Sequence, residues 1–598
     1  MKKWNAAILA GAAVMALAMP ASAQSYTSGT YTGTARGNSG EVKVEVTFSD
    51  SAIENVDIVE DNETTHLMYA VKKILPGRIT DSQSLAVDTV SGATISSYAV
   101  INAVKDCVKQ AGGDVDALTV KAEKAEQAEM ANCDVVVVGA GVSGLMAANV
   151  LQNNGVDVLL IEMQDITGGS GRYSAGRLFG TLADDDYDRI YGAFMKQTTM
   201  NPQPYDETQF PNADKVKQYL EEGHELFDYL KEQMGFELAY YDKAETKVHV
   251  VNSPYEAYSD CKGFQFTEAL TDDYLAAGGR LMLRTTATAL RQDEAGNVIG
   301  VTAATDNGTL TIDAKYTIVA TGSAAYNEEM QKIYQPAHAD GEQRVISMGE
   351  NGSGIQMMLD VGAKVIPDWI NSVATLTTNP MLARTNASEV VTELTATQFS
   401  SSVFDSSELY VDHDGVRRGN EANSFISLSY MEPDYIDALF VVTDAAHAQE
   451  LGFTDQLEEA LASGHECYFK ADTLEELAAA AGFDSEKFVK TVEEYNGYCE
   501  AGEDKAFGKA AEKLVAIGDG PYYAVKEYLV NRDIAGGVYT DLNRQVLNES
   551  GETIGNLFAV GFDSSRDLYA SGIPGASSVG EAAVTGKVAA EYVTSLLK

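Results

Sequence analysis

A glycine-rich turn between two apolar strands is the feature that most constrains the fold of this chain. The segment CDVVVVGAGVSGLMAANVLQNNGVDVLLIEM starts with a valine run, turns through Gly139, Gly141 and Gly144, and continues as an apolar helix. Glycines at this spacing allow a tight turn and let the backbone approach a pyrophosphate at a helix N-terminus. Glu162 ends the next strand, where it can accept hydrogen bonds from ribose hydroxyls. The pattern predicts a Rossmann-like domain for a dinucleotide; a glycine-rich turn in a plain α/β domain is the alternative.

The N-terminus has the pattern of an export signal. Lys2 and Lys3 precede a short apolar run, and Ala-Ser-Ala at residues 21–23 closes it. We predict a signal peptide over residues 1–23 and therefore an exported protein, periplasmic or at the extracytoplasmic cell surface. A buried helix or a membrane anchor is the alternative, but the run is too short to span a bilayer.

The charge balance limits the partners that the chain can bind. The 598 residues carry 43 Lys and Arg against 88 Asp and Glu, a formal net charge of −45. Such a field repels nucleic acid and does not attract an anionic substrate, so an acid-binding pocket would need its own local cations. The seven histidines and five widely spaced cysteines show neither metal-ligand spacing nor a haem motif. We predict no metal site and no nucleic-acid partner.

A second glycine-containing loop lies near the N-terminus. Residues 26–48 alternate apolar and polar side chains, which predicts a β-hairpin or meander, and residues 97–110 carry apolar side chains at helical spacing. Between them, in VDTVSGATIS, Gly92 and Ala93 leave room for a phosphate beside the N-terminus of the helix, with Thr94 at the end of the loop. An ordinary Ser/Thr helix cap is the alternative explanation for this loop.

The stretch from Asp88 to Thr94 resembles a motif of the FMN-binding domain shared by the C subunit of the sodium-pumping quinone reductase and many exported reductases. In that family a D-x-x-[ST]-G-A-[ST] motif receives FMN through a phosphoester at its last hydroxyl. The resemblance implies covalent FMN on Thr94, with Asp88, Ser91, Gly92 and Ala93 as further residues of the FMN site. It also implies a separate flavin transferase as a maturation partner.

The rest of the chain resembles the flavoprotein subunit family of fumarate reductase and succinate dehydrogenase, which includes urocanate reductase and 3-ketosteroid dehydrogenases. The segments that carry the likeness are ITGGSGRYSAG, YTIVATGSAAYN, IGNLFAVGFD and GIPGASSVGEAAVTGKVAAEYV. The matching loops of that family wrap FAD, which implies non-covalent FAD here. The implied FAD-site residues are Gly139, Gly141, Gly144, Glu162, Gly168, Gly169, Thr321, Gly322, Gly561, Gly575 and Ala576. The family's usual glutamate is Phe562 here, with Asp563 one place later as a further cofactor-site residue.

Three segments depart from the fumarate-reducing members of that family. By alignment, the proton-donating arginine falls on Phe425, the histidine pair on Arg532 and Asp533, and the carboxylate-binding arginine on Gly572. A carboxylate buried without an arginine partner is heavily penalised, so fumarate is not expected and urocanate is disfavoured. We expect a neutral or mono-anionic enone, or an arylacrylate held by Arg532 or Arg566.

The proton donor stays open among four candidate residues, and one segment adds a narrower resemblance. The segment LYASGIPGA is similar to that of the steroid dehydrogenases, where tyrosines and backbone amides polarise a ketone near a Pro-Gly turn. A polarised phenol or guanidinium can supply the proton. The predicted catalytic residues are Tyr569, Arg532, Tyr173 and Arg566, with ordinary packing or a surface salt bridge as the alternative for each.

The predicted fold is α/β, with an α+β FMN-binding domain and a Rossmann-like FAD-binding domain that an α+β capping domain interrupts. The predicted boundaries are residues 24–118 for the FMN domain, 119–131 for a linker, 132–368 and 531–598 for the FAD domain, and 369–530 for the cap. The length of the chain also favours roughly two to four domains.

The predicted function is reduction of an activated C=C bond of a small organic acceptor, an enone or an arylacrylate. Electrons would come from a membrane or quinone-linked donor in anaerobic respiration, through covalent FMN to FAD, and reach the acceptor as hydride. Two alternatives stay open: oxidation in the reverse sense, as in ketosteroid dehydrogenases, and a non-catalytic flavin electron carrier.

Overall fold

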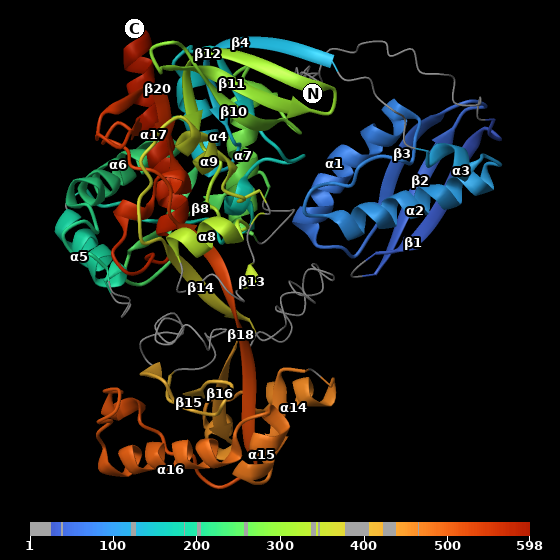
Figure 1. Ribbon diagram of the computed structural model, residues 1–598. Helices are drawn as coiled ribbons and strands as arrows, with labels where there is room; N and C mark the ends of the chain where they lie inside the picture. The colour runs from blue at the N-terminus through green and yellow to red at the C-terminus, as the bar shows by residue number, and fades with distance from the viewer. Residues whose placement is uncertain are drawn as a thin grey trace.

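The computed structural model describes residues 25–37, 40–120, 127–184, 186–199, 205–255, 261–335, 343–344, 347, 349–376, 406–421, 438–464 and 466–598. Figure 1 shows three bodies: an N-terminal one in blue, a central one, and a third in yellow and orange that the long strand β18 (Tyr522–Ala535) joins to the centre. The predicted signal peptide and Phe425 lie outside the described residues, as do the side chains of Arg532 and Asp533.

The N-terminal body is a three-stranded antiparallel sheet with two helices on one face. Its elements are β1 (Gly29–Arg36), β2 (Glu41–Phe48), β3 (Ile53–Glu60), α1 (Thr65–Ser82), α2 (Thr94–Gln110) and the short α3 (Val115–Leu118), with β2 in the middle of the sheet. Alternate residues of β2, from Val42 to Phe48, are buried under the helices because side chains alternate across a strand. The predicted hairpin and helix are confirmed, and the helix begins earlier than predicted, at Thr94.

The central body is built on an eight-stranded sheet in the order β10-β11-β12-β4-β5-β9, with β20 beside β12 and β19 beside β20. The strands β4, β5, β9, β12 and β20 are parallel where they pair, and β10 to β12 form an antiparallel meander. The bounds are β4 (Gln127–Val138), β5 (Val158–Ile161), β9 (Arg280–Met282), β10 (Thr286–Gln292), β11 (Val298–Thr305), β12 (Gly308–Val319), β19 (Gln545–Leu547) and β20 (Thr553–Ala559). Residues 127–131 of the predicted linker are thus strand.

Helices and a small second sheet complete this body. The sheet has the order β6-β8-β7, with β6 (Arg177–Phe179), β7 (Glu237–Tyr240) and β8 (Lys247–Asn252). The helices are α4 (Val142–Asn153), α5 (Tyr187–Thr198), α6 (Ala213–Glu232), α7 (Lys262–Ala276), α8 (Glu328–Tyr334), α9 (Ser353–Asp360) and the C-terminal α17 (Ser577–Leu597).

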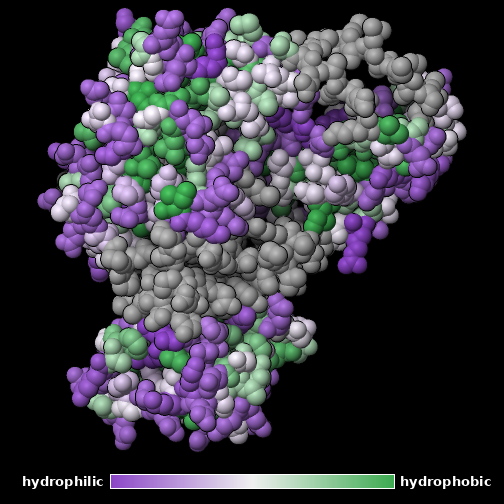
Figure 2. Space-filling view, in the orientation of Figure 1, coloured by the Kyte–Doolittle hydropathy of each residue, from purple (hydrophilic) through white to green (hydrophobic). Residues whose placement is uncertain are grey.

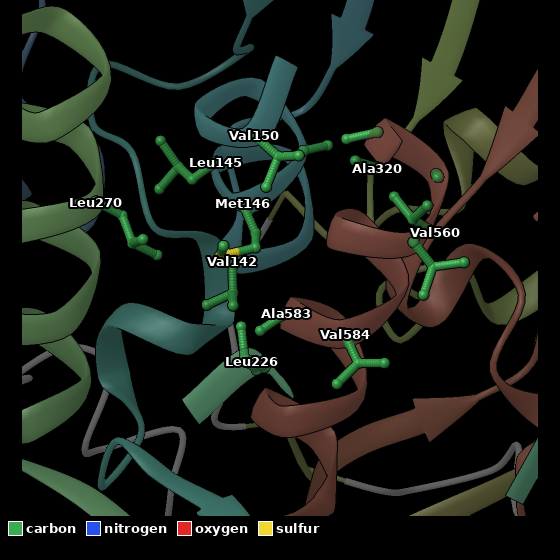
Figure 3. Close-up of a cluster of buried hydrophobic side chains, with 14 of the residues drawn as sticks. Val142, Leu145, Met146, Val150, Leu226, Leu270, Ala320, Val560, Ala583 and Val584 are labelled. Carbon is green, nitrogen blue, oxygen red and sulfur yellow. The ribbon is translucent and has the colours of Figure 1, made fainter. Parts of the chain in front are cut away.

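The core explains why β4 is a run of valines. Val135 and Val137 belong to the apolar cluster on one face of the sheet, and Val136 and Val138 to the cluster on the other. Figure 3 shows the first cluster, where side chains of α4, α6, α7 and α17 converge with residues at the ends of β12 and β20. A Cβ added at Gly586 of α17 would lie 2.2 Å from a backbone oxygen of α4, so this glycine lets the two helices pack closely.

The third body is a smaller α/β unit at the far end of β18. This strand pairs with β14 (Ile370–Leu376) beside the centre and with β16 (Ala438–Asp444) and β17 (Tyr468–Ala471) in the third body, where β15 (Leu409–Val411) lies next to β16. Among the described residues, four helices cover the sheet: α13 (Ala445–Glu450), α14 (Thr454–Ala462), α15 (Leu474–Ala481) and α16 (Ser485–Ala501). The predicted α/β class is confirmed.

The surface reflects the composition. Among the coloured residues of Figure 2, hydrophilic side chains predominate, with apolar side chains scattered among them. Within the described ranges, no helix is both long and apolar enough to cross a membrane. The same ranges contain no cluster of His, Cys, Asp and Glu side chains arranged to hold a metal ion.

Candidate active site

A cavity of about 630 Å³ opens at the carboxyl ends of β4 and β12, between the first turns of α4 and α17. This edge of a parallel sheet is where ligands bind in open α/β folds. The lining brings together the sequence-predicted residues Gly139, Gly141, Glu162, Gly169, Tyr173, Thr321, Gly322, Gly561, Gly575 and Ala576. The predicted residues Gly144, Gly168, Asp563, Arg566 and Tyr569 lie behind this lining.

The first glycine turn has the shape that a phosphate requires. Gly139 has φ +102°, and a Cβ there would lie 2.3 Å from the Ala320 carbonyl oxygen; one at Gly144 would lie 1.9 Å from the Gly139 oxygen. A Cβ at Gly141, in contrast, would meet nothing within 4 Å, because this residue faces the cavity. Gly141 caps α4 without a side-chain hydrogen bond, which leaves N–H donors of the first turn for an anion.

Glu162 joins the turn to the end of the neighbouring strand. Its two carboxylate oxygens accept hydrogen bonds from the backbone N–H groups of Ala140 and Gln164, both at 2.8 Å. The side chain is buried, and burial raises its pKa. Glu162 therefore fixes the turn and lines the cavity at the same time, in the position predicted for a ribose-binding acid.

The second glycine loop brings in a carboxylate that sequence reasoning missed. Glu350 is buried in the cavity wall and accepts hydrogen bonds from Ser170 of the loop and from Ser323. Burial raises its pKa. Gly168 has φ +103° and donates its backbone N–H to Ala140, which ties the second loop to the first at 2.7 Å. No local pattern around Glu350 points to this contact.

Asp563 supports the cavity wall from behind. Its carboxylate accepts hydrogen bonds from the hydroxyl of Thr321 at 2.8 Å and from the backbone N–H of Gly322 at 2.9 Å. It is fully buried, and burial raises its pKa to about 7. The predicted cofactor contact is thus indirect, because Asp563 holds two residues of the lining while Phe562 lies in the lining itself.

Two of the predicted catalytic residues point away from the cavity. Arg566 is buried, donates to backbone carbonyls of Asp368 and Tyr569, and stacks on the Phe210 ring at 3.8 Å. Tyr569 is also buried, and its hydroxyl lies 3.3 Å from that of Ser577. The sequence predicts Tyr569 from the LYASGIPGA segment and Arg566 as a cation for an arylacrylate, but both side chains enter the core. Of the other two predicted catalytic residues, Tyr173 lines the cavity, and the Arg532 side chain lies outside the described residues.

The predicted FMN loop lies beside this cavity. Thr94 is exposed as the first residue of α2, and Ala93 caps the helix without a side-chain hydrogen bond, which suits a phosphate at the helix N-terminus. Gly92 has φ +76°, and a Cβ there would lie 2.7 Å from the hydroxyl oxygen of Tyr173. Tyr173 thus touches the loop that carries Thr94 and also lines the cavity of the central body.

Charged side chains hold this loop against the central body. Asp165 is buried and pairs with Arg78 of α1 and, at 3.2 Å, with Arg284. It also accepts the backbone N–H of Ser91 at 3.2 Å. Asp88 forms an ion pair with Arg284 at 2.6 Å. Asp88 and Ser91, predicted for the FMN site, therefore contact the central body.

Aromatic packing extends this interface along α1 and α7. Tyr69 of α1 packs edge-on against Phe264 of α7, with ring centroids 5.4 Å apart, and Lys73 pairs with Glu268 at 3.3 Å. His66 also faces Phe264, and burial together with the charge of Arg172 lowers the pKa of this imidazole to about 4. The two bodies thus share a packed interface that fixes the Thr94 loop beside the cavity.

Comparison with known proteins assigns the N-terminal body to one family and most of the remaining chain to another. A family model described as an FAD binding domain matches residues 134–576, and one described as an FMN-binding domain matches residues 37–109. The chain belongs to the FAD-binding domain family. It is a two-flavin protein related to the fumarate reductase flavoproteins, so the predicted family and the predicted pair of flavins are confirmed.

Three curated relatives are oxidoreductases that are named for unsaturated substrates. The chain is 26% identical to NADH:acrylate oxidoreductase of Vibrio harveyi over 96% of its own length, and spans 62% of that relative. It is 27% identical to urocanate reductase of Eggerthella lenta (95% of this chain, 92% of the relative) and 26% identical to vinyl phenol reductase of Lactiplantibacillus plantarum (76% and 94%). These relatives confirm the predicted enzyme class, an oxidoreductase acting on CH–CH groups.

Solved structures support the fold. The open conformation of a flavocytochrome c3 fumarate reductase superposes with a TM-score of 0.58 at 22% identity, over 78% of each chain. A 3-ketosteroid delta1-dehydrogenase from Sterolibacterium denitrificans superposes with a TM-score of 0.60 at 18% identity, over 78% of this chain and all of that one (100%). These likenesses show the shared architecture of the central and third bodies.

The cavity residues fit FAD, and the exposed Thr94 loop fits FMN. Open N–H groups at α4, glycines without room for a Cβ, and the buried Glu162 are the features that a dinucleotide requires. Two cations in the same lining were missed by sequence reasoning: Arg177 of β6 and Lys247 of β8. Their sequence surroundings are unremarkable, because only the pairing of β6 with β8 brings them to the cavity.

Proposed function

We propose that this protein is an exported flavin-dependent reductase of an activated C=C bond in a small organic acceptor. FMN esterified to Thr94 would supply electrons to FAD in the central cavity, and FAD would supply the hydride. The acceptor gains that hydride on one carbon and a proton on the other, which converts C=C into CH–CH.

One observation carries this proposal: Tyr173 lines the cavity, and its hydroxyl oxygen lies 2.7 Å from the Cβ position at Gly92 of the Thr94 loop. Two flavin sites that share a wall residue need no further carrier between them. The names of the curated relatives, which include acrylate, urocanate and vinyl phenol, support a C=C acceptor.

The chain's own residues contribute binding, orientation and a proton. The first turn of α4 binds the pyrophosphate, and Glu162 orients the ribose. Burial raises the pKa of Tyr173, so its phenol keeps its proton at neutral pH and can donate it. The third body serves as the cap, and its closure around β18 would exclude water from the acceptor.

The setting of the reaction follows from the sequence. The export pattern at residues 1–23 supports a location outside the cytoplasm, where a flavin transferase attaches the FMN. A membrane or quinone-linked donor then supplies electrons, as in anaerobic respiration.

Anaerobic reoxidation of the reduced holoprotein tests the proposal. The reduced protein is mixed with an arylacrylate, an enone, urocanate or fumarate, and the flavin absorbance is followed. We expect fast reoxidation by the arylacrylate or the enone and formation of the saturated product. If no acceptor in the panel reoxidises the flavins, the protein is an electron carrier and the proposal is wrong.

A further inference from the structure

Two cations of the small sheet β6-β8-β7 face the flavin cavity without a carboxylate partner. Arg177 and Lys247 both line the cavity and are half-buried. Within the described part of the chain, neither side chain forms an ion pair or a hydrogen bond, although the charge of Lys247 acts on Asp242. In a chain of net charge −45, where Arg78, Arg172, Arg284 and other cations are paired with acids, two unpaired cations in one cavity need an explanation.

The register of the sheet brings the two side chains together. Arg177 pairs with His249 and Phe179 pairs with Lys247, so Arg177 and Lys247 are diagonal neighbours on the same face of two adjacent strands. Residues in that relation lie roughly 7–8 Å apart at their Cα atoms, within reach of one ligand for long side chains. The opposite face of β8, with Val248 and Val250, is buried in the core.

Each cation is held at the cavity by its surroundings. The Arg177 guanidinium stacks on the Tyr241 ring, with its carbon 3.3 Å from the ring centroid, which fixes the plane and leaves the N–H edge for a ligand. Its Nε is buried without a hydrogen-bond partner in the described structure. The Lys247 Nζ lies 3.5 Å from the Cβ position at Gly575, in the turn before α17.

The local potential is positive. The pKa of His249 is lowered, first by burial and then by the charges of Lys262 and Arg177. Asp242, in the turn before β8, accepts hydrogen bonds from the backbone N–H groups of Thr246 and Lys247 and from the Thr246 hydroxyl. Burial opposes the lowering of its pKa, and these hydrogen bonds together with the charge of Lys247 produce it, so Asp242 stabilises the turn and offsets part of the Lys247 charge without forming an ion pair with it.

We propose that Arg177 and Lys247 form the binding site for the carboxylate of the acceptor, which is therefore a monocarboxylate conjugated to the C=C bond, of the arylacrylate class. This inference rests on the proposed function. The pyrophosphate of FAD is assigned to the α4 turn, whereas Lys247 lies at the α17 turn beside Gly575. The site replaces the family's carboxylate-binding arginine, whose position in this chain is Gly572, with cations from a different sheet.

Binding to the oxidised holoprotein tests the inference without turnover. Calorimetric titration compares cinnamate with cinnamamide, its neutral isostere, in the wild type and in Arg177→Gln and Lys247→Met. We expect each variant to raise the Kd for cinnamate by about tenfold to a hundredfold, as for a lost hydrogen bond to a charged group, with the Kd for cinnamamide unchanged. Arg291→Gln and Lys315→Met remove surface cations paired with Asp313 and Asp134 and should leave both Kd values unchanged.

The remaining outcomes decide against the inference. Equal weakening of both probes, or no weakening of either, would show that these cations do not bind a carboxylate. A fall in the ratio of FAD to protein in either variant would assign the cations to the cofactor. If cinnamate binds as expected but no acceptor of the panel reoxidises the reduced protein, the carboxylate site stands and the proposed reductase function fails. If an acceptor reoxidises the protein but the variants do not weaken cinnamate selectively, the reductase function stands and this inference fails.

Discussion

Removal of Asp165 should detach the Thr94 loop from the central body. This buried carboxylate pairs with Arg78 and Arg284 and accepts the Ser91 backbone N–H. Asp165 therefore contacts both the N-terminal body and a cation of the central body. We choose Asp165→Ala as the perturbation and Asp165→Asn as an isosteric variant that separates the lost charge from the lost volume. Both variants should weaken docking of the N-terminal body.

The structure sets the size of the effect. Removing one partner of a buried ion pair costs about 3–5 kcal/mol. The side chains of Arg78 and Arg284 are 19% and 28% exposed, and Arg284 keeps its ion pairs with Asp88 and Asp306, so solvent and these acids offset part of the loss. We therefore expect Asp165→Ala to weaken docking by about 2 kcal/mol, or about thirtyfold in the docked-to-undocked ratio.

Chemical modification of His66 reports docking at a distance from the mutation. This imidazole faces Phe264 across the interface, and modification by diethylpyrocarbonate, located by peptide mass spectrometry, measures its access. Asp165→Ala should accelerate modification by up to about thirtyfold and slow the passage of electrons to FAD. The exposed His413 and the surface variant Asp313→Ala serve as controls. Modification of His66 at the wild-type rate in Asp165→Ala would refute the argument.

Three further changes test the cavity itself. Gly139→Ala places a Cβ 2.3 Å from the Ala320 oxygen at a φ of +102°, so we expect loss of bound FAD in the isolated protein, whereas Gly192→Ala, with open space around it, should keep the wild-type ratio of FAD to protein. Tyr173→Phe should keep both flavins but slow acceptor reduction in stopped-flow measurements, and an unchanged rate would exclude its hydroxyl as the proton donor. Burial raises the pKa of Asp563 from about 3.9 in unfolded chains to about 7, so the apoprotein binds an extra proton when folded and its free energy of unfolding should fall as pH rises between these values. Asp563→Asn should flatten this fall in denaturant titrations, and parallel curves for the two proteins would contradict the assignment.

The sequence predicts well those features that residues adjacent in the chain form among themselves. The turn through Gly139, Gly141 and Gly144 follows from backbone sterics, and the valine run of β4 follows from a sheet buried on both faces. The loop before Thr94 is equally local, since a helix N-terminus, a glycine and a hydroxyl stand next to one another in sequence. Such features need no knowledge of what packs against them.

Residues that act through distant contacts could not be predicted in the same way. Arg566 and Tyr569 precede the Pro-Gly turn in sequence, yet a short 3₁₀ turn directs their side chains into the core. Arg177 and Lys247 become neighbours only when β6 pairs with β8. Asp165 meets Ser91 only when two bodies dock, and nothing around either residue in the sequence indicates that contact.

Peptide mass spectrometry of Thr94 tests the central claim most directly. The full chain, matured together with a flavin transferase, is denatured in acid to release non-covalent flavin and is then digested. The account predicts that FAD is released, that the Thr94 peptide carries the mass of one FMN less one water, and that Thr94→Val removes this mass while the released FAD stays the same. A wild-type Thr94 peptide without the adduct, in protein that still releases FAD, would contradict the account.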